Sequence, residues 1–324
     1  MYSLRKLVLA SLTASAALSS ITHAAPQQTD VSQVQGFYHH PVGELMVTAV
    51  YDGYLDLDTQ LLKGLDAEEM SKLFERMFLQ DNKGVQTAVN AFIVQTKDQT
   101  VLVDAGAAQC FGPSMGSALS NIQAAGFQPS DIDSVLLTHL HPDHACGLVT
   151  QDGQAVFPNA AVWVAQTDAD FWLDAETLEK APEDKQPFFK LAQAAVAPYI
   201  AREAFHTYSD GTELLAEIGV VPTPGHTPGH SSYLVESDGE ALLIWGDIVH
   251  SHSVQLQHPE VSIEFDSDQQ QAIKTRTDIL AKVAAERWLV AGAHMPFPGL
   301  GHLRAEDKGY SWVPVEYSPI RTDR

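Results

Sequence analysis

One ten-residue stretch, Thr138–Gly147, constrains the fold of this chain more than any other. It reads Thr-His-Leu-His-Pro-Asp-His-Ala-Cys-Gly and follows an apolar Val-Leu-Leu run, which is typical of a buried strand. Side chains alternate along an extended segment, so His139 and His141 can share one face. Asp143 and His144 lie beyond the strand end and can turn toward a second point. Four metal-ligand side chains in six positions therefore predict a site for two metal ions.

A His-rich surface loop is the alternative interpretation of this stretch, because a single histidine is more often solvated than a ligand. The strand before the histidines and the tight Cys-Gly turn after them argue against such a loop.

Residues 139–144 form a His-x-His-x-Asp-His signature, and on this signature the chain resembles the metallo-β-lactamase superfamily. The resemblance implies three more ligands at the ends of later strands. His226 lies in a Thr-Pro-Gly-His segment that resembles the next ligand loop of the superfamily. Asp247 and His294 each follow an apolar run. Every ligand then comes just after the carboxyl end of an apolar run, which predicts a site along a rim of strand ends.

The resemblance also divides the ligands between two divalent ions. One ion is expected at His139, His141 and His226, the other at Asp143, His144 and His294, with Asp247 bridging both. Zinc is the favoured ion, and manganese, cobalt and iron fit the same donors. Such a pair lowers the pKa of a bound water to roughly 7, so that a bridging hydroxide can attack a carbonyl or phosphoryl centre. Asp247 and Asp143 are the catalytic candidates, with Asp247 expected to pass a proton to the leaving group.

Apolar periodicity predicts an α/β (α+β) chain in which strands and helices alternate. Strands are expected near residues 87–95, 100–103, 135–137, 161–165, 219–221, 232–235 and 241–245, and helices near 66–78, 117–125, 168–178, 187–199 and 268–287. The alternation from Leu45 to Leu57 around Asp52-Gly53 predicts a hairpin. The sequence alone supports only this α/β layering, and the resemblance implies a four-layer αββα sandwich with the metals at one edge between two sheets.

The amino terminus is typical of a secretory signal peptide. Arg5-Lys6 precede an apolar run from Leu7 to Leu18, and small residues lead up to Ala24. That run is too short to span a bilayer, and no later stretch predicts a transmembrane helix. We therefore expect residues 1–24 to be cleaved near Ala24, and residues 25–324 to form a single hydrolase domain exported to a periplasm.

The charge and the cysteine count restrict the partners and the redox chemistry. The chain has 41 acidic and 19 basic residues, a formal charge of −22, and such a surface repels nucleic acids and anionic membranes. This charge favours a small uncharged ester or lactone substrate, although solubility accounts for the same acidity equally well. Two cysteines make no disulfide scaffold. Whether Cys110 and Cys146 pair stays open, with separate thiols the favoured interpretation.

Segments outside the ligands narrow the resemblance to a branch of the superfamily. This branch contains methyl parathion hydrolase together with lactonases and arylesterases that act on dihydrocoumarin-type aromatic lactones. The matching segments are residues 111–113, 168–173, 188–190 and 297–310. The likeness runs over nearly the whole chain and implies a homodimer. It also implies that Phe111, Trp172 and Phe188 line an aromatic substrate pocket.

Three positions depart from methyl parathion hydrolase near this pocket. His250, Ile263 and Phe265 stand where that enzyme has Leu, Thr and Leu. We expect these three side chains to line the pocket and to make it narrower or more polar. A flat aromatic lactone or aryl ester would then be the main substrate, and an organophosphate triester a side activity.

Other functions stay open. A phosphotriesterase, an acyl-homoserine lactonase and a non-catalytic periplasmic metal-binding protein are the alternatives. A glyoxalase-type thioesterase would need basic residues for its anionic substrate, and a true β-lactamase usually lacks a carboxylate at the position of Asp247.

Overall fold

The computed structural model of this protein describes residues 33–80 and 84–320. From Gln35 onward these residues lie in one compact unit, Gln35–Arg324. The expected signal peptide, residues 1–24, lies outside the described residues. Within the described part of the chain, no helix combines the length and the apolar character needed to cross a bilayer.

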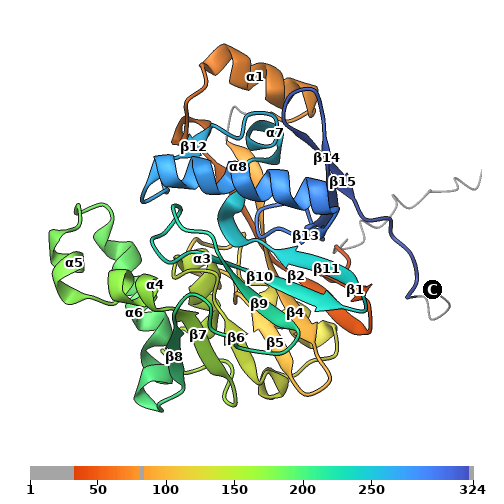
Figure 1. Ribbon diagram of the computed structural model, residues 1–324. Helices are drawn as coiled ribbons and strands as arrows, with labels where there is room; N and C mark the ends of the chain where they lie inside the picture. Colours follow the sequence, from red (N-terminus) through yellow and green to blue (C-terminus); the bar gives the residue numbers. More distant parts are fainter. Residues whose placement is uncertain (1–32, 81–83, 321–324) are drawn as a thin grey trace, which may run out of the picture. The chain divides into compact units, whose positions relative to one another are not determined.

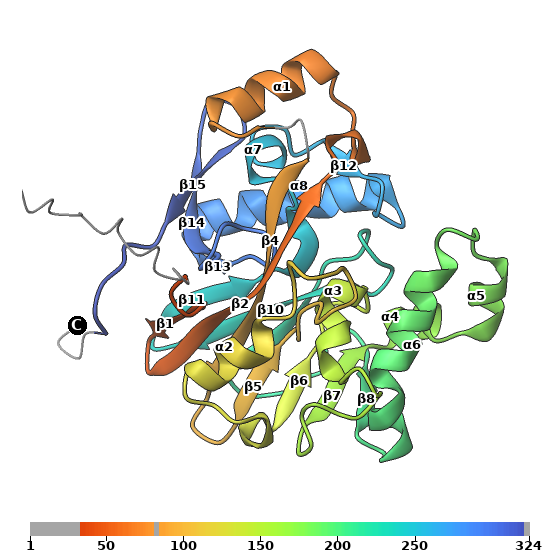
Figure 2. The same cartoon turned by 180° about the vertical axis from the view of Figure 1, so that it is seen from behind.

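Two mixed β-sheets form the body of this unit (Figures 1 and 2). The first sheet contains, in spatial order, β1 (Phe37–Val42), β2 (Leu45–Leu57), β4 (Val85–Gln95), β5 (Thr100–Val103), β6 (Ser134–Leu136), β7 (Ala161–Ala165) and β8 (Phe205–Tyr208). The second contains β15 (Tyr310–Pro314), β14 (Leu300–Ala305), β13 (Leu289–Ala291), β11 (Glu240–Ile244), β10 (Ser231–Ser237) and β9 (Ile218–Pro222). A short pair, β3 (Leu62–Lys63) and β12 (Ser262–Ile263), lies apart from both.

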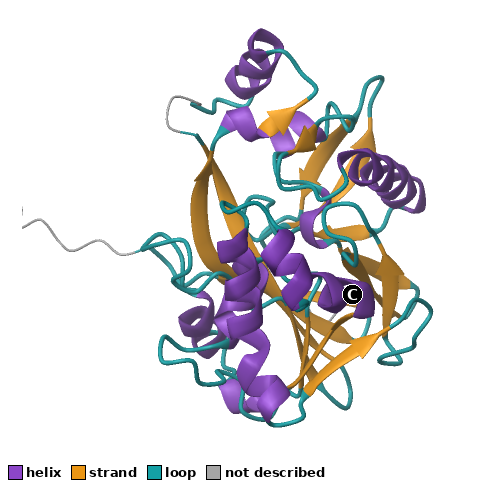
Figure 3. Cartoon of the chain, turned by 90° about the vertical axis from the view of Figure 1, so that its left-hand side faces the viewer, coloured by secondary structure: helices purple, strands orange, loops and turns teal. Residues whose placement is uncertain are grey.

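The helices cover the outer faces of the two sheets (Figure 3). On the seven-stranded sheet lie α2 (Ala118–Ala124), α4 (Gln166–Trp172) and α6 (Gln186–Ala201). Two short helices contact α6, namely α3 (Pro142–Ala145) and α5 (Ala175–Lys180). On the six-stranded sheet lies α8 (Gln269–Glu286), which contacts β14. Two further helices, α1 (Ala67–Arg76) and α7 (His252–Gln255), contact each other. Short 3-10 turns occupy Thr59–Leu61, Pro129–Asp131, Cys146–Leu148 and Gly246–Ile248.

The period of two along the strands explains the four layers. In β5, Val101 and Val103 face a buried cluster to which both sheets contribute, whereas Leu102 faces the cluster beneath the helices of the first sheet. Strand β11 alternates in the same way, with Leu243 facing the cluster beneath α8. Because both faces of these strands are apolar, each sheet needs a layer on either side. The expected αββα fold class is confirmed.

Local capping sets where the helices begin. The side chain of Asp66 accepts a hydrogen bond from Glu69 N at 2.9 Å, and α1 starts at the next residue. At α8 the side chain of Asp268 accepts from Gln271 N at 3.0 Å. The helix ends at Arg287, whose φ of 56° is left-handed.

The expected hairpin between Leu45 and Leu57 is wrong. These residues form one 13-residue strand, β2, with a bulge between Tyr51 and Gly53. The bulge directs the Asp52 side chain into the interior, where its carboxylate accepts hydrogen bonds from Ala107 N and Ala118 N, each at 2.9 Å. Asp52 and Gly53 therefore form a bulge that makes a long-range contact, and not a turn. The hairpin was expected because bulges and tight turns favour the same residue types.

The structure also differs from the favoured interpretation that the two cysteines are separate thiols. Cys110 and Cys146 form a disulfide, which closes a loop between positions 36 residues apart. Cys146 directly follows α3, which carries two of the expected metal ligands, and Cys110 lies in the loop before α2. The bond therefore ties the Phe111 loop to the ligand segment.

We expect loss of this disulfide to lower stability. A closed loop of this length restricts the unfolded chain, so Cys110→Ser with Cys146→Ser should reduce the free energy of unfolding by about 2–4 kcal/mol. Denaturant unfolding of the oxidised wild type and the double variant measures the difference. Equal midpoints and slopes would contradict it.

Candidate metal centre

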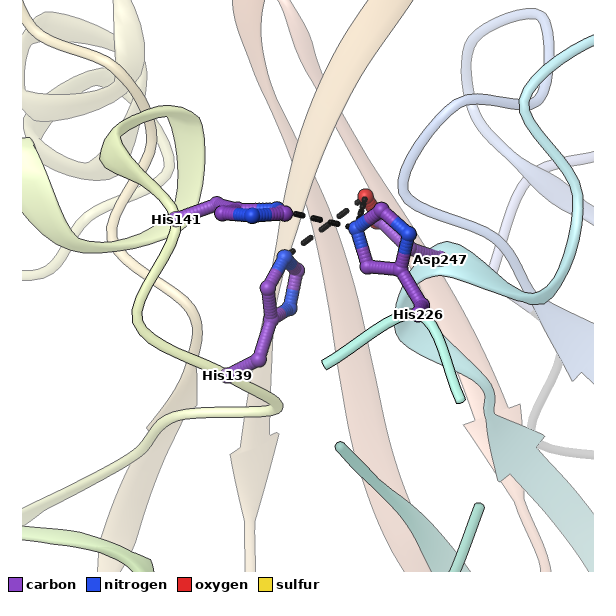
Figure 4. A group of neighbouring side chains, drawn as sticks. All are labelled: His139, His141, His226 and Asp247. Atoms are coloured by element: carbon purple, nitrogen blue, oxygen red, sulfur yellow. Dashed lines mark hydrogen bonds and ion pairs between the residues drawn. The ribbon is translucent and has the colours of Figure 1, made fainter. Parts of the chain in front are cut away.

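The seven expected ligands all come from segments that follow strand ends. After β6 the chain passes through His139 and His141 and enters α3, whose first turn carries Asp143 and His144. The other three ligands lie in the loop between β9 and β10, in the turn after β11 and after β13. The ends of both sheets thus meet at this point, and Figure 4 shows the first of the two groups described below.

The structure brings these side chains together in two groups that share one carboxylate. One group is His139, His141, His226 and Asp247, and the other is Asp143, His144, Asp247 and His294. Within each group, one potential ligand atom per residue lies within 4.8 Å of every other. Metal ions at such sites are held by imidazole nitrogens and carboxylate oxygens, so both groups have suitable donors.

The carboxylate of Asp247 contacts the histidines of both groups. Oδ2 lies 3.2 Å from His226 Nε2 and 3.7 Å from His139 Nε2. Oδ1 lies 3.0 Å from His144 Nε2 and 3.2 Å from His294 Nε2. Oδ2 also lies 3.2 Å from His294 Nε2, so the carboxylate as a whole contacts the histidines of both groups, as a bridging ligand must.

Buried polar atoms without partners test whether a metal fits here. His139 Nε2, His144 Nε2 and Asp247 Oδ1 are buried, and among the described residues none of them has a partner in hydrogen-bond geometry, although His144 Nε2 and Asp247 Oδ1 lie 3.0 Å apart. Such atoms are costly in a protein interior unless something satisfies them. In the first group, His226 Nε2 also lies 2.9 Å from His141 Nδ1. The unpartnered donor atoms converge on the centres of the two groups, so the residues fit a pair of divalent ions.

Asp104 orients one ligand in each group. His144 Nδ1 donates to Asp104 Oδ2 at 2.8 Å, which leaves Nε2 free to bind a metal. Thr138 Oγ1 donates to the same carboxylate at 2.9 Å and accepts from His139 Nδ1 at 3.0 Å. Hydrogen bonds of this kind fix the tautomer and the ring orientation of metal-binding histidines. Asp104 itself has a φ of 58°, a conformation that few non-glycine residues adopt.

A second carboxylate, which the sequence did not single out, orients His226. Asp266 Oδ1 accepts from His226 Nδ1 at 2.9 Å. Arg276, a buried residue of α8, lies 3.7 Å from the other oxygen of Asp266 and donates to the Ile248 carbonyl at 2.7 Å. No local pattern marks Asp266, because its partners are distant in the sequence.

Burial and neighbouring charges set the protonation of the ligands. Desolvation holds the pKa values of His139 and His141 well below their ordinary value, so both rings are neutral and can act as ligands. Burial alone would raise the pKa of Asp247, but the surrounding imidazoles, His144 foremost, hold it well below its ordinary range. Asp247 is therefore a carboxylate, the form that binds metal.

Two further histidines contact Asp247 without belonging to either group. His230 Nε2 accepts from the backbone N of Asp247 at 3.0 Å, and desolvation lowers the pKa of His230 to about 3. His250 Nε2 lies 3.0 Å from Asp247 Oδ2, while its Nδ1 is buried without a partner. His230 thus orients the backbone of the bridging residue, and His250 adjoins its side chain.

A cavity of about 1080 Å³ opens above the ligands. His141, Asp143, His226, Asp247 and His294 lie in its wall. Six aromatic side chains also line it, namely Phe111, Phe171, Trp172, Phe188, Phe189 and Phe265. The Trp172 ring lies 5.0 Å from the His141 ring, centroid to centroid, so the aromatic wall begins directly beside the ligands. Charged side chains outside the ligand set, such as Lys180, Lys185 and Glu264, also line the cavity. A concave site with an aromatic wall and placed polar groups is typical of small-molecule binding.

The expected pocket residues fall into two classes. Phe111, Trp172, Phe188, His250 and Phe265 line the cavity. Ile263 does not: it is fully buried in the cluster of Leu62, Met70 and Phe74, where β3 and β12 meet α1, and is a packing residue. Of the six aromatic lining residues, two were missed, Phe171 and Phe189, although each adjoins an expected one in the sequence.

Comparison with known proteins shows which family the chain resembles. A family model described as the metallo-beta-lactamase superfamily matches residues 84–294. The uncharacterized protein YobT of Bacillus subtilis (strain 168) is 31% identical over 159 residues. That match covers 49% of this chain and 61% of YobT, so the chain spans less than two thirds of that relative.

Two solved structures resemble the chain over most of its length. The hydrolase AbOPH, described as belonging to the beta lactamase superfamily, is 41% identical, with a TM-score of 0.86 and coverage of 89% of this chain and 100% of that one. The dizinc quorum-quenching lactonase AidC is 26% identical, with a TM-score of 0.80 and coverage of 88% and 99%. The AidC structure contains a product, N-hexanoyl-L-homoserine.

Proposed function

The chain belongs to the metallo-β-lactamase superfamily and is a metal-dependent hydrolase, and on this premise we propose that it opens aromatic lactones and aryl esters. We propose hydrolysis of organophosphate triesters as a side activity. Within the superfamily, we propose that the chain belongs to the branch of methyl parathion hydrolase. The observation that carries the proposal is the aromatic wall that begins beside the ligand His141.

The proposed cofactor is a pair of divalent ions, with zinc favoured. His139, His141 and His226 would hold one, Asp143, His144 and His294 the other, and Asp247 both. When bound, such a pair makes water a nucleophile at neutral pH and polarises the carbonyl oxygen of an ester.

The side chains of the protein supply proton handling and orientation. Asp247 lies in the cavity wall, where its carboxylate would take up the proton released by the attacking nucleophile and pass it to the oxygen of the leaving group. Asp143 lies in the same wall and is the second carboxylate within the site. Asp104 and Asp266 keep the ligand imidazoles in place during this transfer, because each holds a ring nitrogen that faces away from the centre.

The aromatic wall favours a flat ring. The Trp172 and Phe189 rings lie 4.5 Å apart, and the Phe111 and Phe188 rings 6.4 Å apart, centroid to centroid. An aromatic substrate gains burial and offset stacking against such rings, on the order of 1 kcal/mol per aromatic pair beyond the buried area. A flat lactone can therefore bind with its carbonyl toward Asp247, while the rings exclude water from its apolar side.

A rate comparison on four substrate classes tests this proposal. We expect an aromatic lactone to give the highest kcat/KM, ahead of an aryl ester, a long-chain acyl-homoserine lactone and a dialkyl aryl phosphotriester. A triester brings bulky substituents to phosphorus before reaction, and a misplacement of about 1 Å can cost on the order of a hundredfold in rate. His250→Leu should raise triester hydrolysis relative to lactone hydrolysis, because His250 lies in the wall beside Asp247.

His252→Leu is the matched control, since His252 lies two residues away and does not line the cavity. This control should leave the ratio unchanged. Two results would replace the proposal with the phosphotriesterase alternative: higher wild-type efficiency on the triester than on every lactone, or an unchanged ratio in His250→Leu. Preference for the acyl-homoserine lactone would point to the relation with AidC. Metal-loaded protein inactive on the whole panel would indicate a metal-binding protein.

We also propose export, on the pattern of the amino terminus, and self-association, on the sequence resemblance. The signal peptide, residues 1–24, would direct the protein to a periplasm, and residues 25–324 would form the exported hydrolase domain. The exported protein would form a homodimer. Mass spectrometry of secreted protein should locate the amino terminus near Ala25, and light scattering at micromolar concentration should give twice the chain mass. An intact amino terminus or a monomer mass would overturn the respective point.

A further inference from the structure

Asp168 is a fully buried carboxylate that takes no part in either metal group or in the cavity wall. It lies in α4, the short helix whose last residue is Trp172. Its Oδ2 accepts a hydrogen bond from Leu140 N at 2.8 Å, and its Oδ1 accepts from Gly229 N at 3.1 Å. One side chain therefore binds the backbones of two separate loops.

Both loops carry ligands of the same metal group. Leu140 lies between the ligands His139 and His141, and Gly229 lies three residues after the ligand His226. Asp168 thus joins the loop with the first two histidines of this group to the loop with the third. A backbone bond between Ser231 N and Thr138 O, at 2.9 Å, links the same two loops farther from the ligands.

The packing around Gly229 shows that the contact is built for close approach. A Cβ at this position would lie 2.3 Å from Asp168 N, so a larger residue would push the loop away from the carboxylate. Burial of the carboxylate is itself unfavourable and raises the pKa of Asp168 to about 6. The two N–H bonds offset that cost, and they hold the loops at one separation.

We propose that Asp168 is a positioning residue that sets the spacing of His139, His141 and His226 before metal binds. The inference rests on the proposed two-ion centre. We expect Asp168 to affect one ion only. No ligand of the other group lies on the loop of Gly229. The backbone of α3, which carries Asp143 and His144, is held by other contacts, such as the hydrogen bond from Ala105 N to the His144 carbonyl.

Asp168→Asn tests the proposal with little change in shape. An amide offers one oxygen as acceptor and places an NH₂ group against the other backbone N–H, so one of the two bonds is lost. Changes of this kind around metal ligands typically cost 10–100-fold in affinity. In a titration of zinc-loaded protein with a chelator, one ion should leave at a 10–100-fold higher free zinc concentration than in wild type. The other should leave at the wild-type concentration, and saturating zinc should restore kcat.

Asp170→Asn is the matched control on the same helix. Its carboxylate is exposed and, within the described part of the chain, accepts a hydrogen bond from the Gln166 side chain alone, so both ions should leave as in wild type. Equal weakening of both ions in Asp168→Asn, or no weakening, would overturn the inference while leaving the two-ion centre intact. A wild type that binds no ion would instead remove the proposed function and the inference together.

Hydrogen exchange in the wild type gives a test that needs no variant. If Asp168 holds the loops before metal binds, the amides of Leu140 and Gly229 should exchange slowly in the metal-free protein as well as in the loaded one. Nuclear magnetic resonance resolves the two amides individually. Fast exchange of both in the metal-free but folded protein would show that metal, and not Asp168, orders these loops.

Discussion

Asp247→Ala is expected to lose nearly all hydrolytic activity, with a fall in kcat of at least about 10³-fold. Loss of a single electrostatic contact in an active site already costs about 10²–10³-fold, and this carboxylate contacts both groups. Its two oxygens lie 3.0 Å from His144 Nε2 and 3.2 Å from His226 Nε2. Without it, the remaining imidazoles face one another with no anion between them, so binding of both ions should weaken.

Asp143→Ala provides a graded comparison, because Asp143 belongs to the second group alone. Metal analysis should show one ion weakened in Asp143→Ala and two in Asp247→Ala. The exposed Asp170→Ala serves as the neutral control. Wild-type turnover in Asp247→Ala would refute the bridging role, and loss of the same single ion from both variants would show that Asp247 is a ligand in one group only.

Removal of metal is expected to abolish activity and to lower the unfolding temperature. The two groups contain buried imidazole nitrogens and a buried carboxylate oxygen with no hydrogen-bond partner, so the metal-free fold retains a desolvation cost. A ligand at a thousand times its dissociation constant stabilises by about 4 kcal/mol. For a domain of this size that corresponds to roughly 10 °C in Tm. Calorimetry of chelated and loaded protein measures the shift.

The same preparations count the ions. Re-addition of zinc should restore activity with two ions per chain. The activity restored by manganese, cobalt and iron should be compared with it, since these ions bind the same imidazole and carboxylate ligands. Full activity at one ion per chain would contradict the two-ion proposal. Full activity in protein stripped of all metal would contradict metal dependence itself.

The four-layer sandwich and the ligands His226, Asp247 and His294 were expected from the resemblance to the superfamily, whereas the sequence by itself determined the α/β layering and the ligand cluster at residues 139–144. Both depend on local patterns: apolar runs of strand length, and histidines and aspartates placed directly after them. When two such sheets pack face to face, the strand ends meet at one edge. His139 of one sheet and His294 of the other thereby reach the same carboxylate, although they are far apart in the chain.

Tertiary structure alone decided the remaining features, and each involves partners that lie far apart in the sequence. Asp52 with Gly53 reads as a turn, yet the buried amide of Ala118 draws the carboxylate inward and the strand continues through a bulge. Ile263 lies in the core, because packing between β3 and β12 directs it there and not toward the cavity. The disulfide of Cys110 depends on how the loop before α2 folds back onto α3.

The carboxylates that orient the ligands were hidden for the same physical reason. Asp168 opens one of the segments that carry the resemblance, but no local pattern predicts that Asp168 or Asp266 would be buried, unlike the many other acids of this chain. Their roles arise when folding buries them against Leu140 N and His226 Nδ1. A buried acceptor must then be satisfied by whichever donor the fold provides, and that donor is set by three-dimensional packing rather than by spacing along the chain.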